Sequence, residues 1–306
     1  MKKILISLFS IGVVAIVAVF ATQAFFSDEE VSRGNILAAG AIDLGVDNHS
    51  FYNGLLNDGT TWRVDYDLSD DPPRQFFNFA DVKPGDWGED TISLHVKDNE
   101  AWLCADVTLT SDDDNGLVDP EEDDGDVTPG VGEGELADAI SWYWWADDGD
   151  NVLESCVSEV VVIQGDDPNT PEVEQEYQVP CVDERLLPAG PLGALSVGQT
   201  AKVTLADSIR NIWTNSSGDP LDAQDVVFLG KAWCFGSSTM EPYPQDGGNR
   251  QNGPDDRPVV CDGTGVNNLA QTDSFTADIA FRAVQSRHNE SFVCDERAEP
   301  TPSITQ

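Results

Sequence analysis

Apolar and polar residues alternate with a period of two along much of the chain. Every second residue is apolar in the segments 42–46, 92–96 and 103–109. The pattern is clearest at 274–285, where one face would carry Phe275, Ala277, Ile279, Phe281 and Ala283. Successive side chains of a strand point to opposite faces, so this alternation predicts half-buried strands. Less regular apolar runs predict further strands at 74–80, 141–146, 159–164, 199–205 and 226–235.

Helical signals are short by comparison. Residues 135–140 suffice for about one and a half turns, and an apolar stripe made by Leu205, Ile209, Ile212 and Trp213 predicts a helix near 205–213. No alternation of strands with long helices occurs. The pattern therefore favours an all-β fold, a jelly-roll-like two-sheet sandwich with short helical inserts and long acidic loops.

Three stretches interrupt the strand pattern and are expected to be surface loops inserted in one domain: 111–135, 165–180 and 236–268. The first is rich in Asp, Glu and Gly. The sandwich domain is expected to span 41–294, with a flexible tail at 295–306. Residues 25–40 form a separate N-terminal segment ahead of it.

Charge excludes one large class of function. The chain of 306 residues carries 56 Asp and Glu against 16 Lys and Arg, a formal charge of −40. No nucleic-acid partner is expected, because phosphate binding requires a basic face. Hydrophobic residues still make up 40% of the sequence, with 13 Phe and 8 Trp, so a core can form.

The N-terminus has the three parts of a secretory signal. Lys2 and Lys3 precede an apolar run over residues 4–20, and Thr22 and Ala24 supply small residues before a cleavage point. We expect cleavage between Ala24 and Phe25. The alternative is an uncleaved anchor, since 17 apolar residues approach the length that spans a bilayer. The first interpretation predicts a secreted protein, either extracellular or held at the cell surface.

Six cysteines follow this segment: Cys104, Cys156, Cys181, Cys234, Cys261 and Cys294. An even number behind a signal peptide predicts disulfide bonds in an oxidising compartment. Joining cysteines across the nearest loops pairs Cys156 with Cys181 and Cys234 with Cys261. This leaves Cys104 to pair with Cys294, one of several connectivities that the sequence permits.

The acidic loop partly fits a calcium-binding loop. With Ser111 at position 1, Asp113 falls at position 3, Asn115 at 5, Asp119 at 9 and Glu122 at 12. Hard oxygen ligands at this spacing are suited to Ca²⁺. Serine at position 1 and the lack of flanking helices argue against a true EF-hand.

A second acidic group, Asp148, Asp150 and Glu154, follows the predicted strand at 141–146 and is a second candidate for Ca²⁺. The alternative for both groups is a set of solvated acidic loops, adapted to high salt.

Other side chains give weaker indications. The four consecutive aromatic residues at 142–145 suggest a sugar-stacking platform, but neighbours on a strand face opposite sides, so at least two are expected in the core. His49, His95 and His288 are far apart in sequence, and neither HExxH nor GxSxG occurs. No catalytic residues are assigned.

Two segments resemble the TasA and camelysin family. The run Ala24-Phe25-Phe26-Ser27-Asp28-Glu29-Glu30 is followed by Gly34-Asn35 and by Ala39-Gly40-Ala41-Ile42-Asp43-Leu44. The turn Val82-Lys83-Pro84-Gly85-Asp86, with an alternating strand after it, is similar to the core of that family. The resemblance covers about 25–47 and 80–110. The six cysteines and the acidic insert depart from its simplest members.

The resemblance implies processing by a SipW-type signal peptidase, with Phe25 as the first mature residue. It also implies a jelly-roll subunit that polymerises head-to-tail into fibres of a biofilm matrix or into pili. Phe25, Phe26 and Val31 would lie in a donor strand that completes the sheet of the next subunit. Camelysin is classed as a metalloprotease, but no zinc-ligand set is evident in this sequence.

Three functions therefore follow from the sequence, in decreasing order of support. The first is an extracellular fibre subunit that assembles with copies of itself. The second is a secreted module that binds Ca²⁺ or glycans, such as a cell-surface or matrix polysaccharide. The third is a secreted hydrolase, including a camelysin-like peptidase.

Overall fold

The computed structural model describes residues 27–32, 36–38, 43–68, 73–155, 160–163, 175–178, 194–240, 242–244, 253–254 and 259–295. Backbone alone is described for 27–38, 160–163 and 175–178. The signal segment with its expected cleavage site at Ala24 and Phe25 lies outside these residues, as do Phe26, Cys156 and Cys181. None of the helices in the described ranges is long and apolar enough to cross a membrane.

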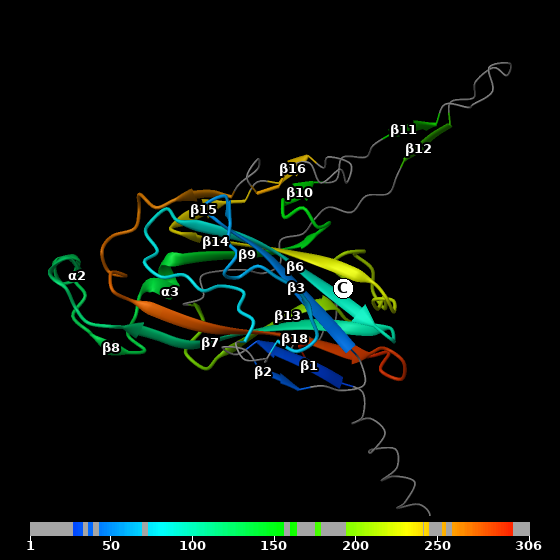
Figure 1. The fold of residues 1–306 in the computed structure, drawn as a ribbon, viewed down its shortest axis with the longest axis horizontal. Helices are drawn as coiled ribbons and strands as arrows, with labels where there is room; N and C mark the ends of the chain where they lie inside the picture. Colours follow the sequence, from blue (N-terminus) through cyan, green and yellow to red (C-terminus); the bar gives the residue numbers. More distant parts are fainter. Residues whose placement is uncertain are drawn as a thin grey trace, which may run out of the picture.

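Two antiparallel sheets of six strands form a sandwich (Figure 1), as the alternation predicts. The first sheet has the order β4-β3-β6-β14-β9, with β5 paired to β3. Its strands are β3 (Asp43–Tyr52), β4 (Leu55–Leu56), β5 (Trp62–Asp65), β6 (Trp87–Lys97), β9 (Ile140–Asp147) and β14 (Val226–Phe235).

The second sheet has the order β13-β7-β18-β1-β2, with β8 paired to β7. Its strands are β1 (Ser27–Ser32), β2 (Ile36–Ala38), β7 (Ala101–Asp114), β8 (Gly130–Val131), β13 (Thr200–Ala206) and β18 (Ser274–Gln285). The short connection between β6 and β7 crosses from one sheet to the other, so these two consecutive strands belong to different layers. Figure 1 shows the two layers facing each other.

The predicted loops contain short elements. The acidic insert holds α2 (Asp119–Asp124) and β8, and α3 (Leu136–Ala139) follows it, as the short helical signal predicts. Three two-stranded pairs lie outside the main sheets: β10 (Glu154–Ser155) with β16 (Tyr243–Pro244), β11 (Val160–Ile163) with β12 (Gln175–Gln178), and β15 (Ser237–Thr239) with β17 (Val260–Asp262).

Two local predictions are wrong. Residues 74–80 pair with no strand in the described structure, because their carbonyls accept side-chain donors: Trp62 Nε1 donates to the Gln75 carbonyl and Lys231 Nζ to that of Phe76. Residues 205–213 do not form a helix: Leu205 and Ala206 end β13, and bends and a turn follow at 207–213. Asp207 Oδ1 accepts the amides of Ile209 and Arg210, which closes a side-chain turn that competes with helix formation.

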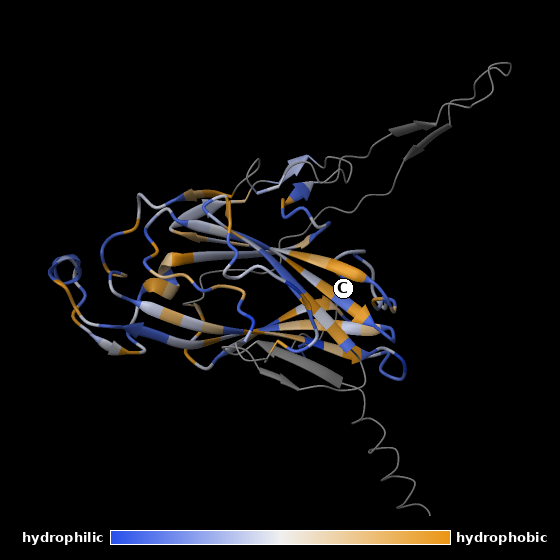
Figure 2. Ribbon diagram, viewed as in Figure 1, coloured by the Kyte–Doolittle hydropathy of each residue, from blue (hydrophilic) through white to orange (hydrophobic). Residues whose placement is uncertain are grey.

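Hydrophobic and hydrophilic residues alternate along the strands of both layers (Figure 2), and the buried apolar residues of the two sheets form one core cluster. Ile92, Leu94 and Val96 of β6 are buried, and so are Ile279 and Phe281 on the facing β18. These are the alternating positions that the sequence predicts to be buried. A smaller apolar cluster on the other face of β9 and β14 contains Trp145, Leu153, Ala232 and Val259.

Disulfide bonds join Cys104 to Cys294 and Cys234 to Cys261. Both pairs agree with the connectivity predicted from the sequence. The first ties β7 to the segment after β18, and the second ties β14 to β17. Disulfide bonds fit an oxidising, extracellular environment.

The turn Val82–Asp86 is built around the Asp86 carboxylate. Asp86 Oδ2 accepts the hydroxyl of Tyr52 at 2.6 Å and the amide of Lys83 at 2.7 Å, while Oδ1 accepts the amide group of Asn53 at 2.9 Å. Gly85 adopts φ +93° and donates its amide to the Phe235 carbonyl. This segment therefore joins β3 to β14 through the residues that carry the family resemblance.

Candidate functional site

The N-terminal segment forms an edge of the second sheet. β1 runs antiparallel to β18, from Ser27 opposite Val284 to Ser32 opposite Ile279. β2 folds back on β1, with Val31 opposite Ile36. The order β7-β18-β1-β2 makes β1 the strand that separates β18 from the edge.

On its other side β18 is paired with β7 along its whole length, from Ser274 opposite Asp113 to Gln285 opposite Ala101. Removal of β1 would therefore turn β18 into an edge strand with unpaired N–H and C=O groups. Such an edge is a template for a strand from another chain. Of the predicted donor residues, the structure describes only Val31, whose Cα pairs with that of Ala280 within the same chain.

The predicted calcium ligands of the acidic loop are not gathered at one point. Asp119 and Glu122 are exposed on α2. Asp113 Oδ1 accepts the amide of Gly132, and Asn115 donates through Nδ2 to the Thr272 carbonyl.

Their sequence neighbours are the residues that turn inward. Ligand atoms of Asp114, Glu121 and Asp273 all lie within 4.8 Å of one another, the single such group of three or more acidic, histidine or cysteine side chains in the described part of the chain. The spacing of acidic residues in the sequence identifies the acidic segment, but it does not show which of its side chains point into the protein. Asp273 gives no local signal, because it lies 152 positions after Glu121 in the sequence, immediately before β18.

The second predicted group lies at the end of β9. Asp150 and Glu154 are buried and Asp148 is half-buried. Asp147 is buried beside them, and its Oδ2 accepts the amides of Gly149 and Asn151. Burial, together with the charge of Asp150, raises the pKa of Asp147 to about 7. This end of the first sheet is therefore a second region of densely packed carboxylates.

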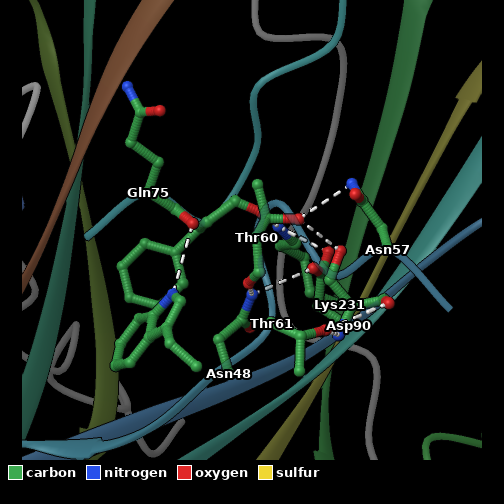
Figure 3. A network of polar contacts seen from close by, with 10 residues as sticks. Asn48, Asn57, Thr60, Thr61, Gln75, Asp90 and Lys231 are labelled. Carbon is green, nitrogen blue, oxygen red and sulfur yellow. Dashed lines mark hydrogen bonds and ion pairs between the residues drawn. The ribbon is translucent and has the colours of Figure 1, made fainter.

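A buried ion pair lies inside the sandwich (Figure 3). Lys231 Nζ is 2.6 Å from Asp90 Oδ2, and Asn48 Nδ2 donates to Asp90 Oδ1 at 3.2 Å and to the Thr60 carbonyl at 2.7 Å. The ammonium group also lies 5.0 Å from the ring centroid of Trp142. Burial lowers the pKa of Lys231, and Asp90 opposes that effect. These contacts fasten the loop before β5 to the centre of the first sheet.

The aromatic run at 142–145 is largely part of the packing. Trp142, Trp144 and Trp145 are buried, and Tyr143 is half-buried with its hydroxyl donating to the Ser238 carbonyl. The run therefore does not form an exposed stacking platform. Trp142 does border a cleft of about 800 Å³ between the loop 77–84 and the loop 267–275.

The three histidines belong to different environments. His95 Nε2 lies 2.7 Å from Asp47 Oδ2, the ring of His49 contacts that of Phe51, and His288 follows β18 with φ +68°. No histidine belongs to the acidic group formed by Asp114, Glu121 and Asp273 among the described residues.

Comparisons with protein-family models, with curated proteins and with solved structures find no match to this chain.

Proposed function

We propose that this chain is a secreted structural subunit that polymerises head-to-tail by exchange of its N-terminal strand. The observation that carries the proposal is the pairing of β1 with β18 at the edge of the second sheet. The resemblance of residues 25–47 to the TasA and camelysin family supports the same function. In the monomer the donor segment occupies its own acceptor edge.

Strand exchange would preserve the main-chain hydrogen bonds of the monomer. β1 of one subunit would pair with β18 of the next in the same register, so the two states differ in which chain supplies β1 and in any new contacts. Assembly would then depend on concentration. Each exchange links one subunit to the next in one direction, which yields an open filament.

The surrounding features suit a matrix or surface protein. The disulfide bonds Cys104–Cys294 and Cys234–Cys261 stabilise the sandwich and persist in an oxidising compartment, which an extracellular protein occupies. A formal charge of −40 keeps subunits soluble by mutual repulsion until a specific contact joins them.

Deletion of residues 25–33 tests the proposal. The truncated chain should keep the β-sheet circular dichroism spectrum and both disulfides but should form no filaments in negative-stain microscopy. A synthetic peptide of residues 25–40 should bind the truncated chain and raise its melting temperature, because it restores the missing strand. A peptide of the same composition in scrambled order is the control.

Filaments formed equally by the truncated and the full chain would contradict strand exchange. A full chain that forms no filaments under conditions of high concentration and physiological salt would contradict the fibre function itself.

A glycan-binding module is the second candidate, favoured by the cleft that Trp142 borders together with Trp233 and Phe275. Aromatic faces in a cleft can stack on sugar rings. Substitution of Phe275 by alanine should abolish binding on a glycan array if this candidate is right, and should leave filament formation unchanged if the first is right.

A further inference from the structure

Five carboxylates from separate segments meet at the end of the sandwich where α2 and β8 project (Figure 1). They are Asp114 at the end of β7, Glu121 in α2, Asp126 after α2, Glu135 before α3 and Asp273 before β18. Ligand atoms of Asp114, Glu121 and Asp273 lie within 4.8 Å of one another. Glu135 interacts electrostatically with Asp126 and Asp273, which extends the group to five. We call this group the carboxylate cluster.

In four of the five carboxylates, one oxygen accepts a hydrogen bond from a backbone amide near the cluster. Asp114 Oδ1 accepts the amide of Gly116 at 2.7 Å, and Glu121 Oε2 accepts the amide of Val118 at 2.7 Å. Asp126 Oδ1 accepts the amide of Thr128 at 2.9 Å.

Asp273 acts in the same way from the other side of the cluster. Its Oδ2 accepts the amides of Glu135 at 2.7 Å and Leu136 at 3.2 Å. The bonds to Asp114, Glu121 and Asp126 are local in sequence, whereas those to Asp273 join segments that are 137 and 138 residues apart. In these four carboxylates the remaining oxygen is consequently fixed in direction.

Glu135 and Asp273 can share a proton in a hydrogen bond between their side chains. The remaining oxygens of the cluster are otherwise buried without a hydrogen bond from any N–H or hydroxyl group of the described residues. They are Asp114 Oδ2, Glu121 Oε1, Asp126 Oδ2, Glu135 Oε2 and Asp273 Oδ1. The exposed fraction is 0% for Glu121, 4% for Asp114 and 6% for Asp126. None of the five forms an ion pair with Lys or Arg in the described part of the chain. A buried carboxylate oxygen without a partner carries a large desolvation penalty, so several at one point require a compensating positive charge or protons.

The crowding of these carboxylates also shifts two of their pKa values. Burial, reinforced by the charges of Asp126 and Asp273, raises the pKa of Glu135 to about 7. Burial also raises the pKa of Asp273, with Asp114 and Glu121 adding to the effect.

We propose that the carboxylate cluster is a calcium site, with Asp114, Glu121 and Asp273 as the central ligands and Asp126 and Glu135 beside them. The ligand set is entirely carboxylate oxygen, which selects a hard cation over Zn²⁺. Ca²⁺ accepts six to eight oxygens in a flexible arrangement, whereas Mg²⁺ requires a near-octahedral site and retains water. A buried group of five carboxylates from a mixture of loops suits the larger ion.

The site would have a structural effect. It joins the acidic insert, through Asp114, Glu121 and Asp126, to the beginning of β18 through Asp273. An ion that binds all of these segments in the folded state alone stabilises that state by mass action. The proposal differs from the loop predicted from the sequence, because Asp113, Asn115, Asp119 and Glu122 are not its ligands.

Glu121→Gln and Glu122→Gln provide a matched test. Both remove one charge from α2, but Glu121 lies in the cluster and Glu122 is exposed. The full chain, stripped with chelator, is titrated with CaCl₂ by calorimetry at fixed ionic strength, with MgCl₂ as a parallel titration. Hydrogen exchange with and without Ca²⁺ then locates the effect along the chain. Asp114→Asn is a second variant in case Glu121→Gln fails to fold.

We expect tight binding of one Ca²⁺ per chain, with slower hydrogen exchange over 113–136 and 267–274. Glu121→Gln and Asp114→Asn should weaken the affinity at least about tenfold, and Glu122→Gln should leave it within about twofold. An absence of tight binding would overturn the proposal and leave protons as the compensating charge. Equal weakening by Glu121→Gln and Glu122→Gln, or equal affinity for Mg²⁺, would also overturn it.

Discussion

Lys231 Nζ lies 2.6 Å from Asp90 Oδ2, and the two side chains, 0% and 1% exposed, are enclosed between the sheets. The residues are direct partners in the register of β14 and β6. A buried ion pair recovers its desolvation cost only when both charges are present. The loss of one partner is therefore more harmful than the loss of both.

Lys231→Met should lower the free energy of unfolding by roughly 3–5 kcal/mol, because it leaves the Asp90 carboxylate buried without its counter-ion. The double variant Lys231→Met with Asp90→Leu should recover most of that loss in urea unfolding. Lys202→Met is the control. The ion pair of Lys202 with Asp106, at 3.4 Å, is partly exposed, so its loss should lower the free energy of unfolding by at most about 1 kcal/mol. A double variant no more stable than Lys231→Met would contradict this account of the pair.

Gly230→Ala should be strongly destabilising, because a Cβ at this position would lie 1.9 Å from Cε2 of the buried Trp145. Because the Trp145 indole must move, the free energy of unfolding should fall by about 2–3 kcal/mol. Gly265→Ala is the matched control, since no atom lies within 4 Å of its added Cβ. Thermal unfolding measures both variants, and a similar melting temperature for the two would show that Trp145 can move without cost.

Stability should fall in acid partly through Asp86. Burial raises the pKa of this group, but hydrogen bonds from Tyr52, Asn53 and Lys83 outweigh it, so the pKa lies below its ordinary value. The contribution is therefore complete above about pH 4 and is lost as the pH falls through the folded-state pKa. Tyr52→Phe should cost about 1 kcal/mol at pH 7 and less at pH 3, because it removes one of those bonds.

Urea unfolding at both values of pH measures this difference. Tyr66→Phe is the control, since that side chain is 40% exposed. If Tyr52→Phe destabilises the chain equally at pH 7 and pH 3, the hydroxyl does not act through the Asp86 charge.

The disulfide bond between Cys104 and Cys294 should contribute more stability than that between Cys234 and Cys261. Their sequence separations are 190 and 27 residues, and a longer closed loop restrains the unfolded chain more. Replacement of either pair by alanine should cost roughly 2–5 kcal/mol, with the larger loss for the first pair. Peptide mapping of the unreduced protein should recover both linkages, and free thiols at these four positions would contradict them.

Much of the fold follows from local alternation, because each half-buried strand carries its own pattern. The strand at 274–285 is predicted to the residue, since its apolar face reaches from Phe275 to Ala283 without interruption. Residues 74–80 have an equally apolar sequence but form no strand. Their carbonyls are used by Trp62 and Lys231, which are remote in sequence.

The sites are harder to predict because they depend on which segments become neighbours. The acidic insert is recognisable from composition, yet the inward residues are Asp114 and Glu121, each next to a residue that the loop spacing selects. Asp273 enters only because β18 pairs with β7. Likewise, the sequence predicts that the N-terminal segment is a strand, but it does not determine that this strand pairs with β18 and not with another sheet edge.

The central claim, exchange of the N-terminal strand, is tested most directly by cross-linking from position 31. A photoreactive benzophenone amino acid replaces Val31, whose Cα pairs with that of Ala280 in the monomer. Equal amounts of ¹⁵N-labelled and unlabelled chain are assembled, irradiated and digested. Strand exchange predicts links within one chain before assembly, and in filaments links to peptides around residue 280 of a differently labelled chain. Filaments in which every such link stays within one chain would contradict it.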